Sequence, residues 1–177
     1  VHSWSHRSDV PLVSVVQDAQ IIVSAVSMQG VVTTAQKLRS LNLSVDKIIV
    51  TATKGLDTET KRTPSQIWHS IFPHNPVVVL SGPNLSKEID QGLPAATVLA
   101  SNNLPAAQQV QQVFASDTFR VYVNQDPIGT ELGGTLKNVM AIAAGVCDGM
   151  NLGTNAKAAL FTRALPEMIR IGTNSGA

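Results

Sequence analysis

Short apolar runs rich in valine and isoleucine recur along the chain, and they constrain its fold more than any other feature. They cover residues 20–26, 47–53, 76–81 and 95–100, with a weaker run at 119–123. Segments of helical length separate them, at 30–41, 63–72, 84–91 and 104–114. Strands that are apolar on both faces and alternate with helices indicate a parallel sheet covered on both sides. We therefore predict an α/β protein.

The strand pattern ends near residue 126, and two long helical segments follow at 128–149 and 155–172. This change predicts a domain boundary, with an α/β domain over 1–126 and the start of a helical domain over 127–177. Pro166 falls inside the second helical segment. Because proline lacks a backbone N–H and its ring crowds the preceding turn, we expect it to kink or split that helix.

The composition excludes several classes of protein. The chain has 177 residues, of which 44% are hydrophobic and 14% charged, as in a globular protein. A net charge of +1 without any Lys/Arg run predicts no nucleic-acid or anionic-membrane partner. The longest apolar run compatible with a helix, 139–147, is far shorter than the roughly 20 residues of a membrane span.

The cysteine and histidine content bears on the compartment and on metal binding. The single cysteine, Cys147, permits no disulfide within the chain, and we expect a cytoplasmic protein. The four histidines show no spacing typical of metal ligands, so no metal site is predicted.

Polar residues follow the predicted strands, where α/β proteins bind their ligands. Lys54 comes directly after the run 47–53, and its amine could hold a phosphate group or a carbonyl oxygen. A solvated loop lysine would fit the position equally well. After the run 76–81, a Gly-Pro turn leads to Asn84, a suitable N-cap for a helix whose free N–H groups could receive an anion. An ordinary cap is the commoner interpretation.

The segment 131–148 consists almost entirely of small or apolar residues, yet Lys137 and Asn138 stand at its centre. On a helix, Lys137 shares a face with Gly133, Gly134, Ala141, Ala144 and Gly145. Such a bare face permits close helix packing, but packing around an unpaired ammonium group is costly. A polar cavity beside Lys137 explains the pattern better. Asn138, about 100° further round the helix, would reach the same cavity, and Lys137 would be placed to act as a general acid or base.

Several short motifs occur in a fixed order, and together they are specific. They are Thr53-Lys-Gly55, Leu80-Ser-Gly-Pro83, Lys87-Glu88, Gly92-Leu-Pro94, Phe119-Arg-Val-Tyr122, Glu131-Leu-Gly-Gly134, Leu136-Lys-Asn-Val139 and Asp148-Gly149. From about Trp4 to Gly176 the chain resembles the bacterial NAD(P)-dependent glycerol-3-phosphate dehydrogenases. The resemblance implies a partial Rossmann-like dinucleotide-binding domain, followed by the start of an all-helical substrate domain, with the active site between them.

The resemblance also implies an activity and a set of substrate-contacting residues. The reaction is hydride transfer between NADP or NAD and C2 of dihydroxyacetone phosphate or sn-glycerol 3-phosphate. By motif match, Lys137 is the acid/base lysine, and Asn138 is the asparagine beside it. Lys54 contacts both substrate and nicotinamide. Gly82 and Asn84 match substrate-contacting positions, although the family usually has Ser or Thr where Asn84 stands.

Three further residues match positions that contact the cofactor. His6 and Arg7 follow a tryptophan, as the residues that bind the adenosine phosphate do in the family, and Ser86 matches another cofactor position. No acidic residue directly follows Trp4, so the 2′-phosphate of NADP would be better received than in a strict NAD enzyme. The choice between NADP and NAD stays open.

Parts of the family pattern lie outside these residues. The glycine-rich turn would precede residue 1, and the Ser-Arg-Asn motif that binds the substrate phosphate would follow residue 177. We therefore expect these 177 residues alone to bind cofactor poorly and to turn over little substrate.

Two alternatives stay open. One is a related β-hydroxyacid dehydrogenase, although that group separates its lysine and asparagine by a helical turn. The other is a non-catalytic fragment. The family resemblance is compatible with a homodimer, and it implies a supply of glycerol 3-phosphate for phospholipid synthesis.

Overall fold

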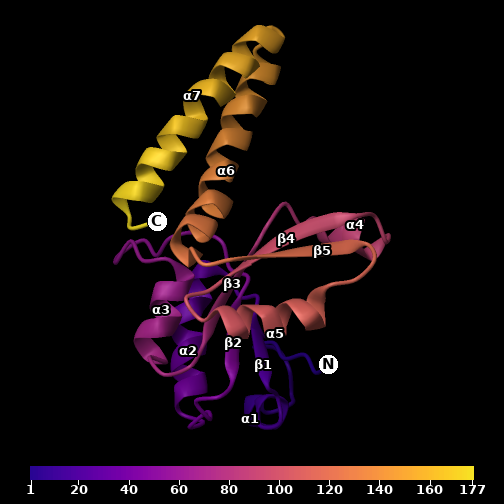
Figure 1. Ribbon diagram of the computed structural model, residues 1–177, viewed down its shortest axis with the longest axis vertical. Coiled ribbons are helices and arrows are strands. Elements are labelled where there is room, and N and C mark those ends of the chain that lie inside the picture. The colour runs from indigo at the N-terminus through magenta and orange to yellow at the C-terminus, as the bar shows by residue number, and fades with distance from the viewer.

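The computed structural model describes residues 1–177 and contains one five-stranded sheet (Figure 1). The strands are β1 (Ile21–Ser24), β2 (Ile48–Thr51), β3 (Val77–Ser81), β4 (Ala95–Ala100) and β5 (Phe119–Asn124), and they lie in the order β1-β2-β3-β4-β5. All five predicted strands are confirmed.

The helices lie between the strands and after them. They are α1 (Leu12–Val16), η1 (Met28–Gly30), α2 (Val31–Arg39), α3 (Pro64–Ile71), α4 (Ser86–Asp90), α5 (Leu104–Phe114), α6 (Pro127–Gly149) and α7 (Gly153–Asn174). The predicted helices are all present, with ends that differ by a few residues. The prediction omitted α1, because a five-residue helix is too short to show a hydrophobic period.

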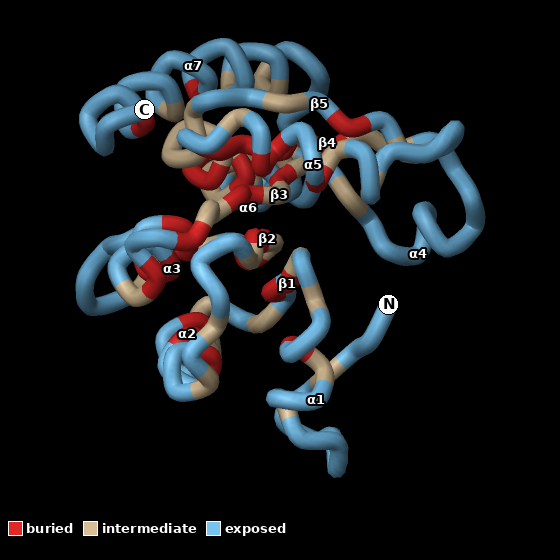
Figure 2. The backbone as a smooth tube through the Cα atoms, turned by 60° about the horizontal axis from the view of Figure 1, so that its bottom comes forward, coloured by how far each residue is buried: buried red, intermediate tan, exposed pale blue.

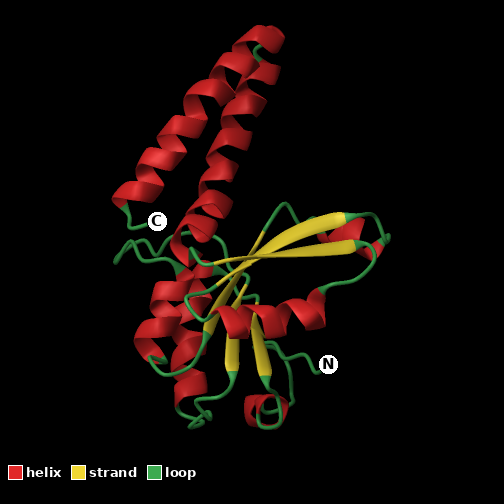
Figure 3. Cartoon of the chain, viewed as in Figure 1, coloured by secondary structure: helices red, strands yellow, loops and turns green.

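The sheet is parallel except between β3 and β4, where Val79 pairs with Ala100 and Ser81 with Val98 in antiparallel register. The predicted parallel sheet is thus confirmed for three strand pairs and wrong for this one. The connection over residues 82–94 contains only the short α4, and it turns the chain back instead of crossing the sheet. Figure 3 shows β4 and β5 extending beyond the other strands as a result.

Both faces of the sheet carry an apolar core, as the strand pattern predicts. Ile49 of β2 packs with Leu38 of α2 and Trp68 of α3 on one face. The next residue, Val50, packs with Val78 and with Val110 of α5 on the other. Figure 2 shows the buried residues gathered where these layers meet. Each fully buried side chain of this size contributes roughly 1.5–3 kcal/mol, so the two cores fix the helices on the strands.

Proline and a capping side chain start each of three helices. Thr63 caps α3 in a capping box with Gln66, Asn103 caps α5 through the Ala106 N–H, and Asp126 caps α6 through the Gly129 N–H. In each case a proline stands at the first or second helical position, where a missing N–H costs little.

Helices α6 and α7 form an antiparallel hairpin that extends away from the sheet (Figure 1). Lys157 of α7 pairs with Asp148 of α6 at 2.7 Å. Of the predicted kink or split at Pro166, the split is wrong, because α7 continues through this residue. Pro166 is exposed, so water can satisfy the carbonyl group that loses its partner.

Several large apolar side chains of this hairpin are exposed. They are Val139, Ile142, Val146, Met150, Leu152, Phe161, Leu165, Ile169 and Ile171. None of the helices combines the length and the apolar character that a membrane span requires.

Candidate active site

Two strand ends are joined through Lys54. Thr53 anchors the segment after β2 by donating a hydrogen bond to the Val26 carbonyl at 2.8 Å. The next residue, Lys54, extends its side chain to β3, where its Nζ donates to the Gly82 carbonyl oxygen at 3.2 Å. The lysine amine therefore turns toward the carboxyl ends of the strands, as its position in the sequence predicts.

Lys137 of α6 lies near enough to Lys54 to repel it. The pKa of Lys54 falls below its usual value, first because its amine is partly buried and second because of the positive charge of Lys137. Neither lysine belongs to an ion pair. Two positive groups from distant parts of the sequence, neither paired with an acid, thus lie within electrostatic reach of each other, an arrangement suited to an electron-rich oxygen atom. Asn138 follows Lys137 on α6 and is exposed.

Gly82 and Asn84 form a tight turn after β3. A Cβ atom on Gly82 would lie 2.8 Å from the Ala96 carbonyl oxygen and 2.9 Å from Asn84 Oδ1. Contrary to the prediction, Asn84 does not cap α4. Instead Leu85 stands at the N-cap, and Asn84 Nδ2 donates to the Ala96 carbonyl at 2.9 Å. The amide therefore ties the turn to β4, which runs back beside β3.

Helix α6 is seated directly on the strand ends. Gly134 faces Ser81 so closely that a Cβ atom would overlap the Ser81 hydroxyl. Thr135 Oγ1 accepts a hydrogen bond from the Gly55 N–H at 3.1 Å. Sequence reasoning missed both contacts. The Gly133-Gly134 pair was the available signal, because small residues permit close approach to another element. The pair does not indicate which residue α6 approaches.

A buried acid makes a third contact between α6 and the sheet domain. Glu131 is only 4% exposed, and its Oε1 accepts the Ser65 N–H at 2.8 Å while its Oε2 accepts the Ser65 hydroxyl at 2.5 Å. Burial raises the pKa of Glu131, and the hydrogen bonds from Ser65 and Thr63 oppose that rise. The sequence drew attention to Glu131 only as part of a motif, and Ser65 was not predicted at all.

The predicted cofactor residues lie apart from this cluster. His6, Arg7 and Ser86 are all exposed. The turn that holds His6 and Arg7 is closed by Ser5 and Ser8, and Ser86 begins the short α4. No hydrogen bond or ion pair joins these three residues to Lys54 or Lys137 in this structure.

Two cavities lie along the sheet. An apolar one of about 450 Å³ crosses the strands at Val23, Ala52 and Leu80 and is completed by Asn84, Ile89, Phe114 and Phe119. Asn84, two residues after Gly82, belongs to its lining, so this cavity adjoins the Gly82 turn.

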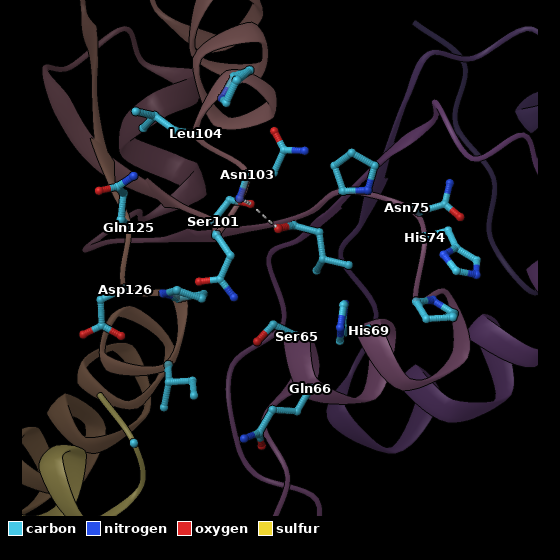
Figure 4. A pocket seen from close by; sticks show the side chains of 18 of the residues that line it. Ser65, Gln66, His69, His74, Asn75, Ser101, Asn103, Leu104, Gln125 and Asp126 are labelled. Atoms are coloured by element: carbon cyan, nitrogen blue, oxygen red, sulfur yellow. Dashed lines mark hydrogen bonds between the residues drawn. The ribbon is translucent and has the colours of Figure 1, made fainter.

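The second cavity, of about 1020 Å³, is larger and more polar. Figure 4 shows Ser65, Gln66 and His69 of α3 facing Ser101, Asn103 and Asp126 across it. Its lining includes neither Lys54 nor Lys137, so its size does not make it the site of chemistry. No group of three or more His, Cys, Asp or Glu side chains is arranged to hold a metal ion.

Comparison with known proteins assigns the chain to a family. The family model described as the NAD-dependent glycerol-3-phosphate dehydrogenase N-terminus matches residues 7–107, and the corresponding C-terminus model matches residues 126–177. The chain belongs to the NAD-dependent glycerol-3-phosphate dehydrogenase family. The resemblance inferred from the motifs is confirmed, and of the two enzyme families considered, the matches favour this one.

Individual relatives support the same assignment. The chain is 63% identical over 174 residues to the glycerol-3-phosphate dehydrogenase [NAD(P)+] of a Synechocystis strain, covering 98% of this chain and 55% of the relative. It is 64% identical over 177 residues to the enzyme of that name from a Nostoc strain, covering 100% of this chain and 58% of the relative. The chain therefore spans little more than half the length of these relatives.

A solved structure confirms the fold. The glycerol-3-phosphate dehydrogenase of Coxiella burnetii superposes with a TM-score of 0.86 at 35% sequence identity, covering 94% of this chain and 51% of that one. The predicted α/β class, with a partial Rossmann-like sheet followed by helices, agrees with this neighbour.

Proposed function

We propose that the protein containing this chain interconverts sn-glycerol 3-phosphate and dihydroxyacetone phosphate by hydride transfer with NADP or NAD. The observation that carries the proposal is the meeting of Lys54 and Lys137, unpaired by any acid, at the carboxyl ends of the strands. The names of the relatives support both the substrate and the cofactor.

Each residue of the cluster has a part in this chemistry. In the direction of reduction, the Lys137 ammonium group donates a proton to the C2 oxygen of dihydroxyacetone phosphate as a hydride reaches C2. Lys54, oriented by the Gly82 carbonyl, donates a hydrogen bond to the substrate. Asn138 contacts the substrate beside Lys137, and Gly82 and Asn84 line its binding position. In oxidation, the neutral Lys137 amine takes the proton back.

The residues present fit a nicotinamide cofactor, which supplies or accepts the hydride when bound. The apolar cavity beside the Gly82 turn offers a surface for one face of a flat ring. Arg7 and His6 are exposed and free to receive an adenosine phosphate, with Arg7 suited to the 2′-phosphate of NADP. Ser86 would contact the cofactor from α4.

We also propose a domain division, a cellular compartment and an oligomeric state for this protein. The chain divides into a partial dinucleotide-binding domain over 1–126 and the start of the substrate domain over 127–177, which the beginning of α6 and the limits of the two family models support. We place the protein in the cytoplasm, where it supplies glycerol 3-phosphate for phospholipid synthesis. For its assembly we propose a homodimer, with which the family resemblance is compatible.

The test uses the full-length gene product that contains these residues. We expect NADPH or NADH oxidation that depends on dihydroxyacetone phosphate. Lys137→Met should abolish this turnover while the cofactor still binds, because methionine keeps an unbranched side chain of similar bulk and has no amine to donate a proton. The matched control is Lys157→Met, which removes a lysine of the same hairpin outside the cluster. Turnover of Lys137→Met equal to the wild type would refute the acid/base role.

A further inference from the structure

The position of the Lys137 amine depends on how α6 is held on the sheet domain. Glu131, Gly134 and Thr135 are spaced by three and four residues, so they lie on one side of the helix. These three positions make the contacts with Ser65, Ser81 and Gly55 described above. Lys137 stands less than one turn beyond Thr135. Whatever fixes this side of α6 therefore fixes the separation of Lys137 from Lys54.

Glu131 makes the most demanding of these contacts. Ser65 is the second residue of α3, so its N–H belongs to the first turn and has no partner within the helix. The Glu131 carboxyl group accepts that N–H and the Ser65 hydroxyl together, across 66 positions of sequence. A carboxyl group buried in this way carries a desolvation cost that an apolar side chain would avoid. Its contribution is a directed contact that an apolar side chain cannot make.

We propose that Glu131 is a positioning residue, whose buried carboxyl group fastens α6 to the first turn of α3 and thereby holds Lys137 near Lys54. The proposal rests on the function proposed above. Glu131 lies about 9 Å along the helix axis from Lys137, at roughly 1.5 Å per residue. A helix is stiff over that length, so a shift at Glu131 is transmitted to the amine. Displacements of about 1 Å at a reacting group can lower a rate about a hundredfold.

The contact requires hydrogen-bond acceptance and not negative charge. Glutamine keeps an oxygen in the position of Oε1 and can accept the Ser65 N–H, whereas alanine leaves that N–H without a partner. Glu131→Gln should therefore preserve the position of α6, and Glu131→Ala should release it. This difference separates positioning from any direct electrostatic effect of the acid on the two lysines.

The experiment compares the two variants in the full-length gene product. For Glu131→Ala we expect kcat to fall about ten- to a hundredfold, with KM for the cofactor changed less than about twofold. For Glu131→Gln we expect kcat within about threefold of the wild type. The pKa of the Lys54 amine, followed by NMR of labelled lysine, should rise in Glu131→Ala and not in Glu131→Gln, because only alanine lets Lys137 move away. A loss of stability alone would not move that pKa.

Defined results would overturn the proposal. A folded Glu131→Ala protein with wild-type kcat would do so, as would a Glu131→Gln protein as impaired as Glu131→Ala. If Glu131→Ala does not fold, Glu131→Met replaces it, since methionine fills the buried position but cannot accept the Ser65 N–H. A lower kcat with normal cofactor affinity supports the proposal, and an unchanged kcat refutes it. A wild-type protein inactive on dihydroxyacetone phosphate would instead refute the proposed function.

Discussion

Gly134 of α6 lies against Ser81 at the end of β3, so closely that a Cβ atom on Gly134 would overlap the Ser81 hydroxyl oxygen. An added Cβ at Gly134 would overlap the Ser81 hydroxyl and nothing else nearby except Ser81 Cβ, at 3.6 Å. This approach is one of three contacts that hold α6 on the sheet domain, with those of Glu131 and Thr135. A residue without a side chain is therefore needed at this point of α6, where the helix meets the sheet.

The Gly134 contact can be tested with a compensating change. We expect Gly134→Ala to lower the free energy of unfolding by about 1–3 kcal/mol, because the overlap forces α6 away from β3. Adding Ser81→Ala should restore most of the loss, since it removes the overlapping oxygen. Chemical denaturation of the single and double variants measures both effects.

Gly133→Ala is the matched control, because a Cβ at that position meets nothing within 4 Å. Alanine there should raise the free energy of unfolding by about 0.5–1 kcal/mol, since it favours the helix. Equal losses of stability at positions 133 and 134 would contradict the close approach to Ser81.

The pKa of Lys54 should respond to Lys137. Lys137→Met removes one of the two causes that hold the Lys54 pKa down, so that pKa should rise toward its usual value. It should stay below that value, because partial burial of the amine, the larger cause, remains. NMR titration of labelled lysine measures the change, with Lys157→Met as a variant that should leave Lys54 unaffected. An unaltered Lys54 pKa in Lys137→Met would show that the two amines are not neighbours.

Glu131 should make stability depend on pH in a definite direction. Its pKa is raised in the folded protein, chiefly by burial, so the folded state holds a proton that the unfolded state has already released. The free energy of unfolding should therefore fall as the pH rises from the usual pKa of glutamate to the raised value, with a limiting slope of about 1.4 kcal/mol per pH unit. At pH values below the usual glutamate pKa, Glu131 should not lower the free energy of unfolding.

Glu131→Gln removes this titration. Its free energy of unfolding should be flatter than that of the wild type across the same window, as measured by urea denaturation at several pH values. Parallel pH profiles for the two proteins would argue against a raised Glu131 pKa.

Gly82 should tolerate no side chain. Gly82→Ala places a methyl group 2.8 Å from the Ala96 carbonyl oxygen, and backbone cannot yield as a side chain can. We expect this overlap to lower the free energy of unfolding by about 1–3 kcal/mol. The Gly82 carbonyl also accepts a hydrogen bond from the Lys54 amine, so we expect a higher KM for dihydroxyacetone phosphate as well. Kinetics and denaturation of the same preparation test the two effects. Gly92→Ala is a useful comparison, since its cost comes from a positive φ of 73° without any steric contact.

The strands, most helices and the family could be predicted because each is encoded locally. The runs that form β1 to β4 are mostly apolar residue after residue, and this is the pattern of a strand buried on both faces. Lys137 could also be recognised from local sequence, because it is a charged residue among small and apolar residues. The antiparallel direction of β4 could not be predicted, because nothing in the sequence of residues 82–94 indicates whether the chain crosses over the sheet or turns back beside β3.

The sequence by itself thus determined the elements, the two apolar faces of the sheet and the candidate lysines. Only the tertiary structure decided which side chains meet: Lys54 with the Gly82 carbonyl, Gly134 with Ser81, and Glu131 with Ser65. Burial and helix propensity are properties of a residue and its near neighbours, so a local pattern can carry them. A contact between residues 66 positions apart depends instead on how whole helices and strands pack, and no local pattern contains that information.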